Sequence, residues 1–173
     1  QTINDIDCGP GAAAAIAVGN KGACFAVTNT GATRLSGPSI TLPTDNNFLS
    51  VSAPTASEAW IGTGGAQGSS IAYLYHSVDG VLQADQAGYH DSGILGVFMR
   101  TNRIGHMLTG QTDPNTNVWL DSGVNSTVDG VNWWVDTNVP STRVIKTGAD
   151  GRSAQVTIAF NDVALVSAEE GWI

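Results

Sequence analysis

The residues best suited to chemistry in this chain are its histidines, and their spacing predicts neither a metal site nor a cofactor site. His76, His90 and His106 have no metal-ligand spacing to one another or to the cysteines. Neither a Gly-x-Ser-x-Gly nucleophile turn nor a phosphate-binding Gly-Lys-Ser/Thr loop occurs in the sequence. We therefore expect no metal, no cofactor and no catalytic residues.

Two Asp-Gly pairs lie in similar local sequences. The first is Ser77-Val78-Asp79-Gly80, and the second is Thr127-Val128-Asp129-Gly130-Val131-Asn132-Trp133. An aspartate in a hairpin turn accepts hydrogen bonds from nearby backbone N–H groups, and glycine adopts positive φ at little steric cost. The hydroxyl two residues before the aspartate ties the turn to its strand, and Trp133 is expected to pack beneath it. These residues are therefore predicted to be structural rather than a catalytic carboxylate pair.

The turns belong to an internal repeat. Its anchors are Ile6, Val51, Val97 and Val163, at intervals of 45, 46 and 66 residues. Repeats of this length are typical of β-propellers and solenoids. Strand-like runs alternate with Gly and Asn turns, and no convincing helix appears, so the sequence predicts an all-β chain of four-stranded antiparallel blades. The predicted single repeat domain, 1–173, contains blades at 3–38, 46–88 and 93–139 and a partial blade at 155–173, with 136–156 as a connection.

The pattern Ser/Thr-x-Asp-Gly-x-x-Trp resembles the Asp-box, or BNR repeat, of sialidase-like and sortilin-like propellers. With Ser57–Gly62 and Ala168–Trp172, the chain is most similar to the repeat of the photosystem II assembly-factor family and its bacterial relatives. This resemblance implies a helper or structural subunit. Sialidase activity would need an arginine cluster and a tyrosine nucleophile, and the arginines of this chain fit no such pattern. A glycosidase remnant is therefore the last of the alternatives.

Three and a half blades do not close a ring, because propellers typically have four to eight. An open stack would expose apolar blade faces and strand edges to water. We therefore expect a protein partner, or the remaining blades of a longer chain, to complete the propeller. An open solenoid would need capping repeats, which the sequence does not show.

Composition excludes several classes of function. The 173 residues carry a formal charge of −8 with only seven Lys and Arg, so no basic stripe exists to neutralise nucleic-acid phosphates. No run of residues approaches the roughly 18 apolar positions of a membrane span. The 21 glycines and the 42% hydrophobic fraction suit a turn-rich globular β protein.

Two weak signals predict a secreted or lumenal location. Cys8 and Cys24 lie in the same repeat, and we expect a disulfide between them, with two buried reduced thiols as the alternative. Asn125-Ser126-Thr127 is an N-glycosylation sequon, which would make Asn125 a glycan acceptor in a eukaryotic extracytoplasmic protein.

Three residues are predicted to contact a partner. Trp134 must face opposite to Trp133 if both lie in one strand, so it is the better candidate for an exposed contact. Arg100 and Arg103 are candidate interface anchors in an acidic chain, although solvated surface positions are the ordinary alternative. The favoured function is a non-catalytic scaffold for protein–protein interaction, and the alternative is a carbohydrate-binding lectin or adhesin.

Overall fold

The computed structural model describes the chain as an all-β structure. It describes the backbone of residues 2–35, 47–64, 71–90, 93–112, 119–136, 142–147, 152–157, 164–165 and 171–172. Side chains are described within 2–35, 47–64, 72–83, 93–110 and 123–136. In this part of the chain no helix has the length and apolar character needed to span a membrane.

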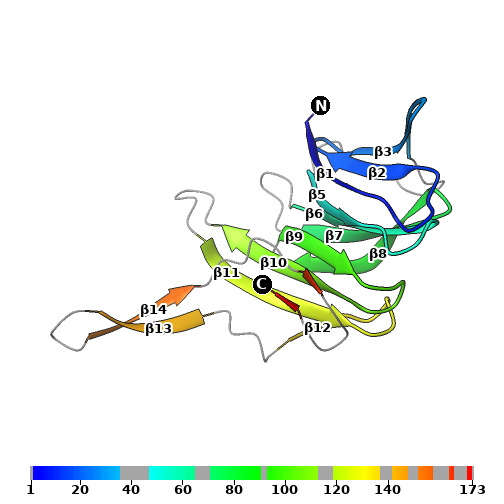
Figure 1. The fold of residues 1–173 in the computed structure, drawn as a ribbon. Coiled ribbons are helices and arrows are strands. Elements are labelled where there is room, and N and C mark those ends of the chain that lie inside the picture. Colours follow the sequence, from blue (N-terminus) through cyan, green and yellow to red (C-terminus); the bar gives the residue numbers. More distant parts are fainter. Residues whose placement is uncertain are drawn as a thin grey trace.

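Three four-stranded antiparallel sheets follow one another along the sequence, each with its strands in chain order. The first contains β1 (Ile3–Asp7), β2 (Ala15–Gly19), β3 (Ala23–Thr28) and β4 (Gly31–Arg34). The second contains β5 (Phe48–Ser52), β6 (Glu58–Thr63), β7 (Ile71–Val78) and β8 (Val81–His90), and the third β9 (Gly93–Met99), β10 (Gly105–Thr112), β11 (Trp119–Thr127) and β12 (Trp134–Val135). The sheets stack face to face, so they have the arrangement of successive propeller blades (Figure 1).

Two hairpins follow the third sheet. β13 (Thr142–Thr147) pairs with β14 (Arg152–Thr157), and β15 (Ala164–Leu165) pairs with β16 (Gly171–Trp172). Most of the first hairpin lies within the predicted connection 136–156. Val144 and Ile145 are β-branched and favour a strand, and the predicted turn at Ala149-Asp150-Gly151 lies between the two strands.

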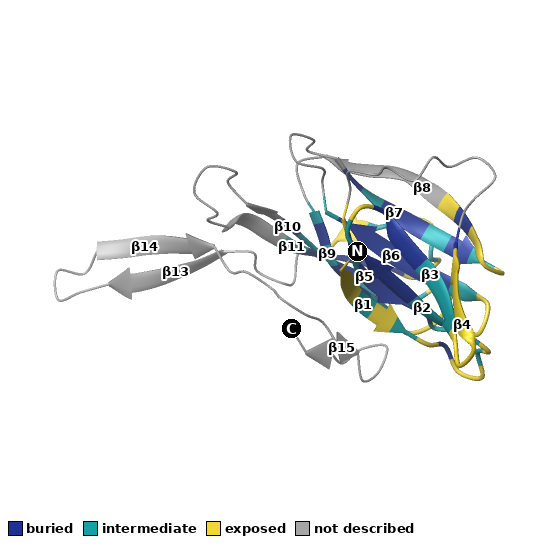
Figure 2. Cartoon of the chain, turned by 90° about the horizontal axis from the view of Figure 1, so that it is seen from above, coloured by how far each residue is buried: buried dark blue, intermediate teal, exposed yellow. Residues whose placement is uncertain are grey.

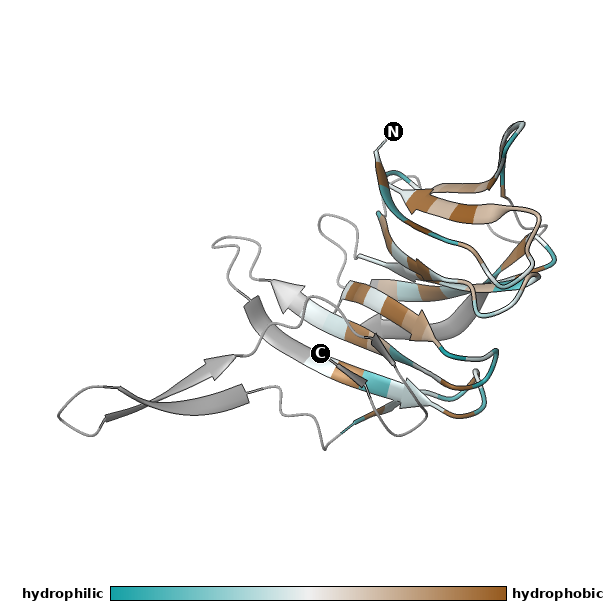
Figure 3. Cartoon of the chain, viewed as in Figure 1, coloured by the Kyte–Doolittle hydropathy of each residue, from teal (hydrophilic) through white to brown (hydrophobic). Residues whose placement is uncertain are grey.

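The core lies between the sheets. Side chains alternate along each strand, so the second sheet contributes to two interfaces. Ala59, Ile61 and Tyr75 pack toward the first sheet, and Trp60 and Leu74 pack toward the third. Buried residues are concentrated on the second sheet, between its two neighbours (Figure 2). Alternation is visible in the apolar bands along the central strands (Figure 3).

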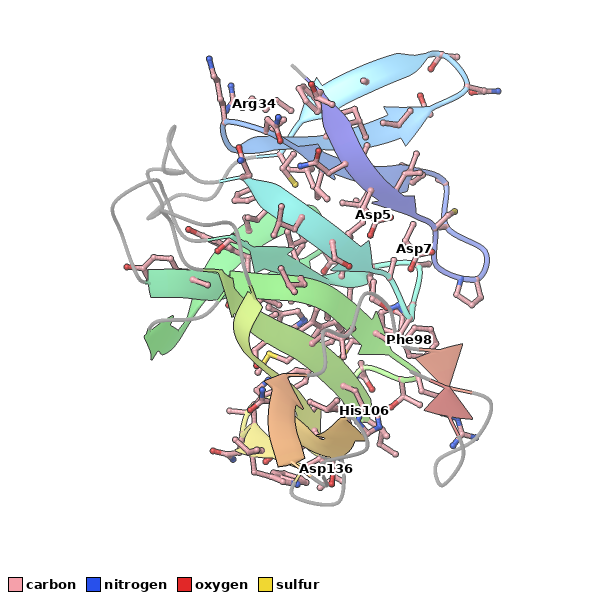
Figure 4. All side chains as sticks on the ribbon, turned by 90° about the vertical axis from the view of Figure 1, so that its left-hand side faces the viewer. Asp5, Asp7, Arg34, Phe98, His106 and Asp136 are labelled. Atoms are coloured by element: carbon pink, nitrogen blue, oxygen red, sulfur yellow. The ribbon has the colours of Figure 1, made fainter. Side chains whose placement is uncertain are left out.

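The innermost strands of successive sheets are joined by side chains that accept backbone hydrogen bonds. The Oδ2 atoms of Asp5 and Asp7 on β1 accept the N–H groups of Val51 (2.8 Å) and Ala53 (2.7 Å). We call these bonds, together with those between the second and third sheets, the inner ladder. Figure 4 shows the two aspartates on β1 beside the second sheet.

The same linkage recurs one repeat later. Ser50 Oγ accepts the Val97 N–H at 3.1 Å, and Ser52 Oγ accepts the Met99 N–H at 2.9 Å. Each acceptor lies one residue before or after a repeat anchor, and each donor lies 46 or 47 residues further along the chain. The sequence repeat is therefore a repeat of inter-sheet hydrogen bonding as well as of strands.

The predicted disulfide is not formed, because both cysteines are free thiols. Cys24 pairs with Val18, which pairs with Asp5, whereas Cys8 lies three residues beyond Asp5. Two strand spacings alone separate backbones by about 9–10 Å, and a disulfide requires Cα atoms within about 7 Å. Cys24 is fully buried, and burial raises its pKa to about 12, while Cys8 is exposed.

Candidate functional site

The turn at Thr127–Trp133 is held by the aspartate and the hydroxyl predicted to hold it. Asp129 Oδ1 accepts the N–H groups of Val131 (2.9 Å) and Asn132 (2.7 Å), and Thr127 Oγ1 accepts the Gly130 N–H at 2.9 Å. The Thr127 hydroxyl donates to Asp129 Oδ1 at 3.1 Å. Gly130 has φ +76°, the left-handed conformation expected of it.

The turn stabilises the charged form of its own carboxylate. The Asn132 side-chain amide donates to Asp129 Oδ2 at 2.7 Å. This bond is the largest cause that lowers the pKa of the Asp129 carboxyl below its usual range, followed by the backbone N–H groups of Asn132 and Val131. Trp133 packs against the buried cluster between the second and third sheets. The turn is therefore fixed both by hydrogen bonds and by packing.

The Ser77–Gly80 turn has a different structure. Asp79 and Gly80 form a two-residue connection between β7 and β8, and both have positive φ, at 50° and 78°. Such a turn matches the twist of a hairpin, and Asp is tolerated there. Among the described residues the Asp79 carboxylate has no hydrogen-bond partner, while its N–H donates to Ser57 O at 2.8 Å. The two Asp-Gly copies therefore hold their hairpins by different means.

Arg100 and Arg103 lie on the short loop between β9 and β10. Thr101 Oγ1 accepts the N–H groups of Arg103 (3.1 Å) and Ile104 (3.0 Å), which fixes the loop. Both arginines are exposed. A Cβ atom on Gly130 would lie 2.7 Å from Asn102 O, so the arginine loop lies directly against the Asp129 turn.

Exposed large apolar side chains of the described residues gather mainly at two places. One is the segment that follows β11, where Val128 is 62% exposed, Val131 67%, Trp134 45% and Val135 63%. The other is β1. We call the first group, together with Arg100 and Arg103, the loop surface. It combines apolar side chains with two cations on backbone fixed by turn hydrogen bonds, which suits a surface that binds a partner.

A polar cluster of the second sheet supports the loop surface. Glu58 Oε2 lies 3.2 Å from His76 Nε2, and Glu58 Oε1 accepts the Asn102 side-chain amide at 3.4 Å. The His76 ring stacks on Trp60 with centroids 4.0 Å apart. Glu58 thereby links the second sheet to the arginine loop.

His106, Ser126 and Asp136 lie close together on the third sheet, but not in the order of a nucleophile triad. His106 Nδ1 is 2.8 Å from Ser126 Oγ, which is 3.5 Å from Asp136 Oδ2. The hydroxyl thus lies between the other two groups, whereas a triad places the histidine between them. Burial lowers the pKa of His106, and the Asp136 charge raises it to a smaller extent. The arrangement suits a link between β10, β11 and β12 (Figure 4).

Asn125 is poorly placed to carry a glycan in the folded chain. It lies within β11 and is 7% exposed, and its amide nitrogen donates to Thr109 Oγ1 at 3.2 Å. A glycan on that nitrogen would displace the strand from the sheet interface. Modification of Asn125 stays a prediction.

Comparison with known proteins supports the fold. No family model matches the chain, and no curated protein matches it. Among solved structures, it is similar to the one titled "YCF48 bound to D1 peptide", with a TM-score of 0.55 and 18% identity over 78% of this chain. The fold is that of propeller blades. The match spans 40% of the length of the YCF48 chain.

The sequence found part of this site. The structure brings Arg100, Arg103 and Trp134 near one turn, as parts of the third sheet and its loops. Sequence reasoning missed Val128, Val131 and Val135, although an apolar residue on either side of an Asp-Gly pair is a readable signal of an exposed hydrophobic turn. It also missed the Glu58–His76–Asn102 contacts, because these residues come from three separate elements.

Proposed function

We propose that the chain is a non-catalytic scaffold whose loop surface binds a segment of another protein. The observation that carries this proposal is the exposure of Val128 and Val131 on the Asp129 turn, which lies against the loop of the exposed Arg100 and Arg103. Isolated exposed apolar residues are ordinary, whereas a cluster beside charged side chains is typical of interaction sites. The turn and the arginine loop contact each other, so the surface is largely formed before binding.

The charges of the loop surface indicate the chemistry of the partner. The chain as a whole is acidic, yet this surface carries two of its seven cations. A segment with apolar and acidic side chains would satisfy both the valines and the arginines. The likeness to a propeller solved with a bound peptide supports a peptide segment as the partner. The resemblance to assembly-factor repeats supports a role in assembly, and the Asp-box character of the Thr127–Trp133 turn is part of this proposal.

Panning a displayed random-peptide library against the purified chain tests the proposal. We expect enrichment of peptides that combine acidic and apolar residues. Binding of a selected peptide should weaken by about tenfold or more in the Arg100→Glu/Arg103→Glu variant, since about 1.4 kcal/mol corresponds to tenfold. Lys21→Glu changes an exposed cation on the first sheet and should leave affinity within about twofold. Equal binding by the double variant and wild type would refute the proposal.

One observation favours carbohydrate binding as a second candidate function. The Trp134 ring is 45% exposed on the short strand β12, where it is accessible for stacking against a sugar. A glycan array read with wild type and with Trp134→Ala distinguishes the two functions. Carbohydrate binding predicts glycan signals that disappear in the variant, whereas peptide binding through the arginines predicts a blank array.

A further inference from the structure

Two turns of this chain have the same four-residue sequence. Val78-Asp79-Gly80-Val81 joins β7 to β8, and Val128-Asp129-Gly130-Val131 follows β11. An Asp-Gly pair is chemically labile, because glycine has no side chain to obstruct the approach of its backbone nitrogen to the aspartate carboxyl. The neighbouring residues are identical, so the two pairs have the same intrinsic reactivity. A difference between them in the folded chain must therefore come from the structure.

The reaction open to such a pair is isomerisation through a succinimide ring. The glycine nitrogen attacks Cγ of the protonated aspartate carboxyl, an N–C bond forms, and the carboxyl OH leaves with the N–H proton as water. Water then opens the ring. Opening at Cγ restores aspartate, whereas opening at the main-chain carbonyl carbon gives isoaspartate, in which the chain continues through Cγ. The product has the mass of the starting chain, and water is the only co-reactant.

At the Asp129 turn both reacting groups are held by hydrogen bonds. The Gly130 N–H, which carries the attacking nitrogen, donates to Thr127 Oγ1 at 2.9 Å. The carboxylate accepts two backbone N–H groups on Oδ1 and the Asn132 side-chain amide on Oδ2, at 2.7–2.9 Å. These bonds also lower the pKa of the Asp129 carboxyl, so its reactive protonated form is rarer. Ring closure requires several of these bonds to break.

At the Asp79 turn neither reacting group is held. Among the described residues the Asp79 carboxylate has no hydrogen-bond partner and the Gly80 N–H has no acceptor. Both residues are exposed, so water reaches the carboxyl and the ring. The nearest atom to a Cβ on Gly80 would be Leu35 Cδ2, at an ordinary 3.8 Å, whereas a Cβ on Gly130 would lie 2.7 Å from Asn102 O. The Asp79 turn therefore also has more room to change its backbone path.

We propose that Asp79 is a site of spontaneous isomerisation to isoaspartate in the folded chain, and that hydrogen bonding protects Asp129 from the same reaction. Isoaspartate adds one atom to the backbone between β7 and β8, which are joined by only two residues. The Val78–Val81 pair closes this hairpin, and the Asp79 N–H donates to Ser57 O at 2.8 Å. The modification therefore lengthens a connection that fixes the pairing of two strands of the second sheet.

Ageing of the full chain at neutral pH under native conditions tests the proposal. Chymotrypsin cleaves after Tyr75 and Leu82 and so places the two Asp-Gly pairs on separate peptides. Isoaspartate in each peptide is measured by its chromatographic separation from aspartate and by methylation with an isoaspartyl methyltransferase. We expect isoaspartate to accumulate at Asp79 at least about tenfold faster than at Asp129, because breaking one hydrogen bond to a charged group slows a reaction by about that factor.

The chain unfolded in urea is the control for intrinsic reactivity. Its two identical tetrapeptides should isomerise at similar rates, since neither turn is formed there. Equal accumulation at the two sites in the folded chain, or faster reaction at Asp129, would overturn the proposal. Absence of isoaspartate from Asp79 of the folded chain, over a period in which both sites react in urea, would overturn it as well.

Two variants test whether hydrogen bonds are what protects Asp129. Asn132→Ala removes the exposed amide that donates to Oδ2, and Thr127→Val removes the acceptor of the Gly130 N–H. Each should raise the rate at Asp129 several-fold and leave the rate at Asp79 unchanged in the same sample. Thr127 is buried, so circular dichroism must show that its variant keeps the sheets. A rate at Asp129 that neither variant changes would contradict the proposed protection.

Discussion

Replacing Asp5 and Asp7 together by asparagine is expected to lower the free energy of unfolding by about 3–5 kcal/mol. Each carboxylate accepts one N–H of its own strand and one of the second sheet, at 2.7–2.8 Å. An asparagine offers one oxygen, and its NH₂ group would face a backbone N–H donor. Hydrogen bonds to charged groups contribute about 1.5–3 kcal/mol each, and an unsatisfied partner adds its desolvation cost. Urea unfolding followed by circular dichroism measures the change.

Asp79→Asn is the matched control for this variant. It makes the same chemical change at an exposed aspartate whose carboxylate has no hydrogen-bond partner in the described part of the chain, and asparagine tolerates its positive φ. We expect a change within about 0.5 kcal/mol. If the double variant and Asp79→Asn unfold at the same urea concentration, the aspartates do not join the first two sheets.

The inner ladder also shows where sequence reasoning stops. Hydrophobic alternation and Gly-Asn turns predicted the three four-stranded sheets, because both are local properties of the chain. The ladder depends on which strands become neighbours. The repeat indicated those strands, because its anchors lie on the innermost strands of successive sheets. Asp5, Asp7, Ser50 and Ser52 all lie one residue before or after an anchor. A polar residue on each side of an apolar anchor residue is the signal that was available.

The two Asp-Gly turns show that similar local sequences can form different turns. Both were interpreted as one motif, yet the number of residues between the paired strands decides which turn conformation each one adopts. β7 and β8 are separated by two residues, so Asp79 itself must take a positive φ. β11 and β12 are separated by six residues, which leaves the Asp129 carboxylate free to accept N–H groups from later positions.

The structure supports neither of the two signals behind the predicted secreted or lumenal location. The cysteines are free because strand register separates them, and Asn125 faces an inter-sheet interface instead of solvent. Cysteine counts and sequons are read without knowledge of which strands are neighbours or which face of a strand a residue occupies. The location therefore stays a prediction.

Gly62→Ala is expected to destabilise the chain by separating the second and third sheets. A Cβ atom at Gly62 would lie 2.5 Å from Ile94 Cγ2 and 3.0 Å from both Ile94 O and Val97 Cγ2. Ile94 is fully buried and one of the contacts is backbone, so neither neighbour has room to move. Overpacking of this kind costs about 1–3 kcal/mol. Alanine also restricts the unfolded chain, which raises the free energy of unfolding by about 0.4–1 kcal/mol. We therefore expect a net decrease in the free energy of unfolding of about 1–2 kcal/mol.

Gly123→Ala separates this packing effect from the general preference of strands against glycine. Gly123 also lies within a strand, but its Cβ would meet only Thr109 Oγ1, at an ordinary 3.5 Å. Only the restriction of the unfolded chain by alanine then remains, and the free energy of unfolding should rise by up to about 1 kcal/mol. Opposite signs in urea unfolding would show that Gly62 is required by the close approach of two sheets. Stabilisation by both substitutions would mean that the second and third sheets tolerate a wider spacing. Their contact would then not require a glycine at position 62.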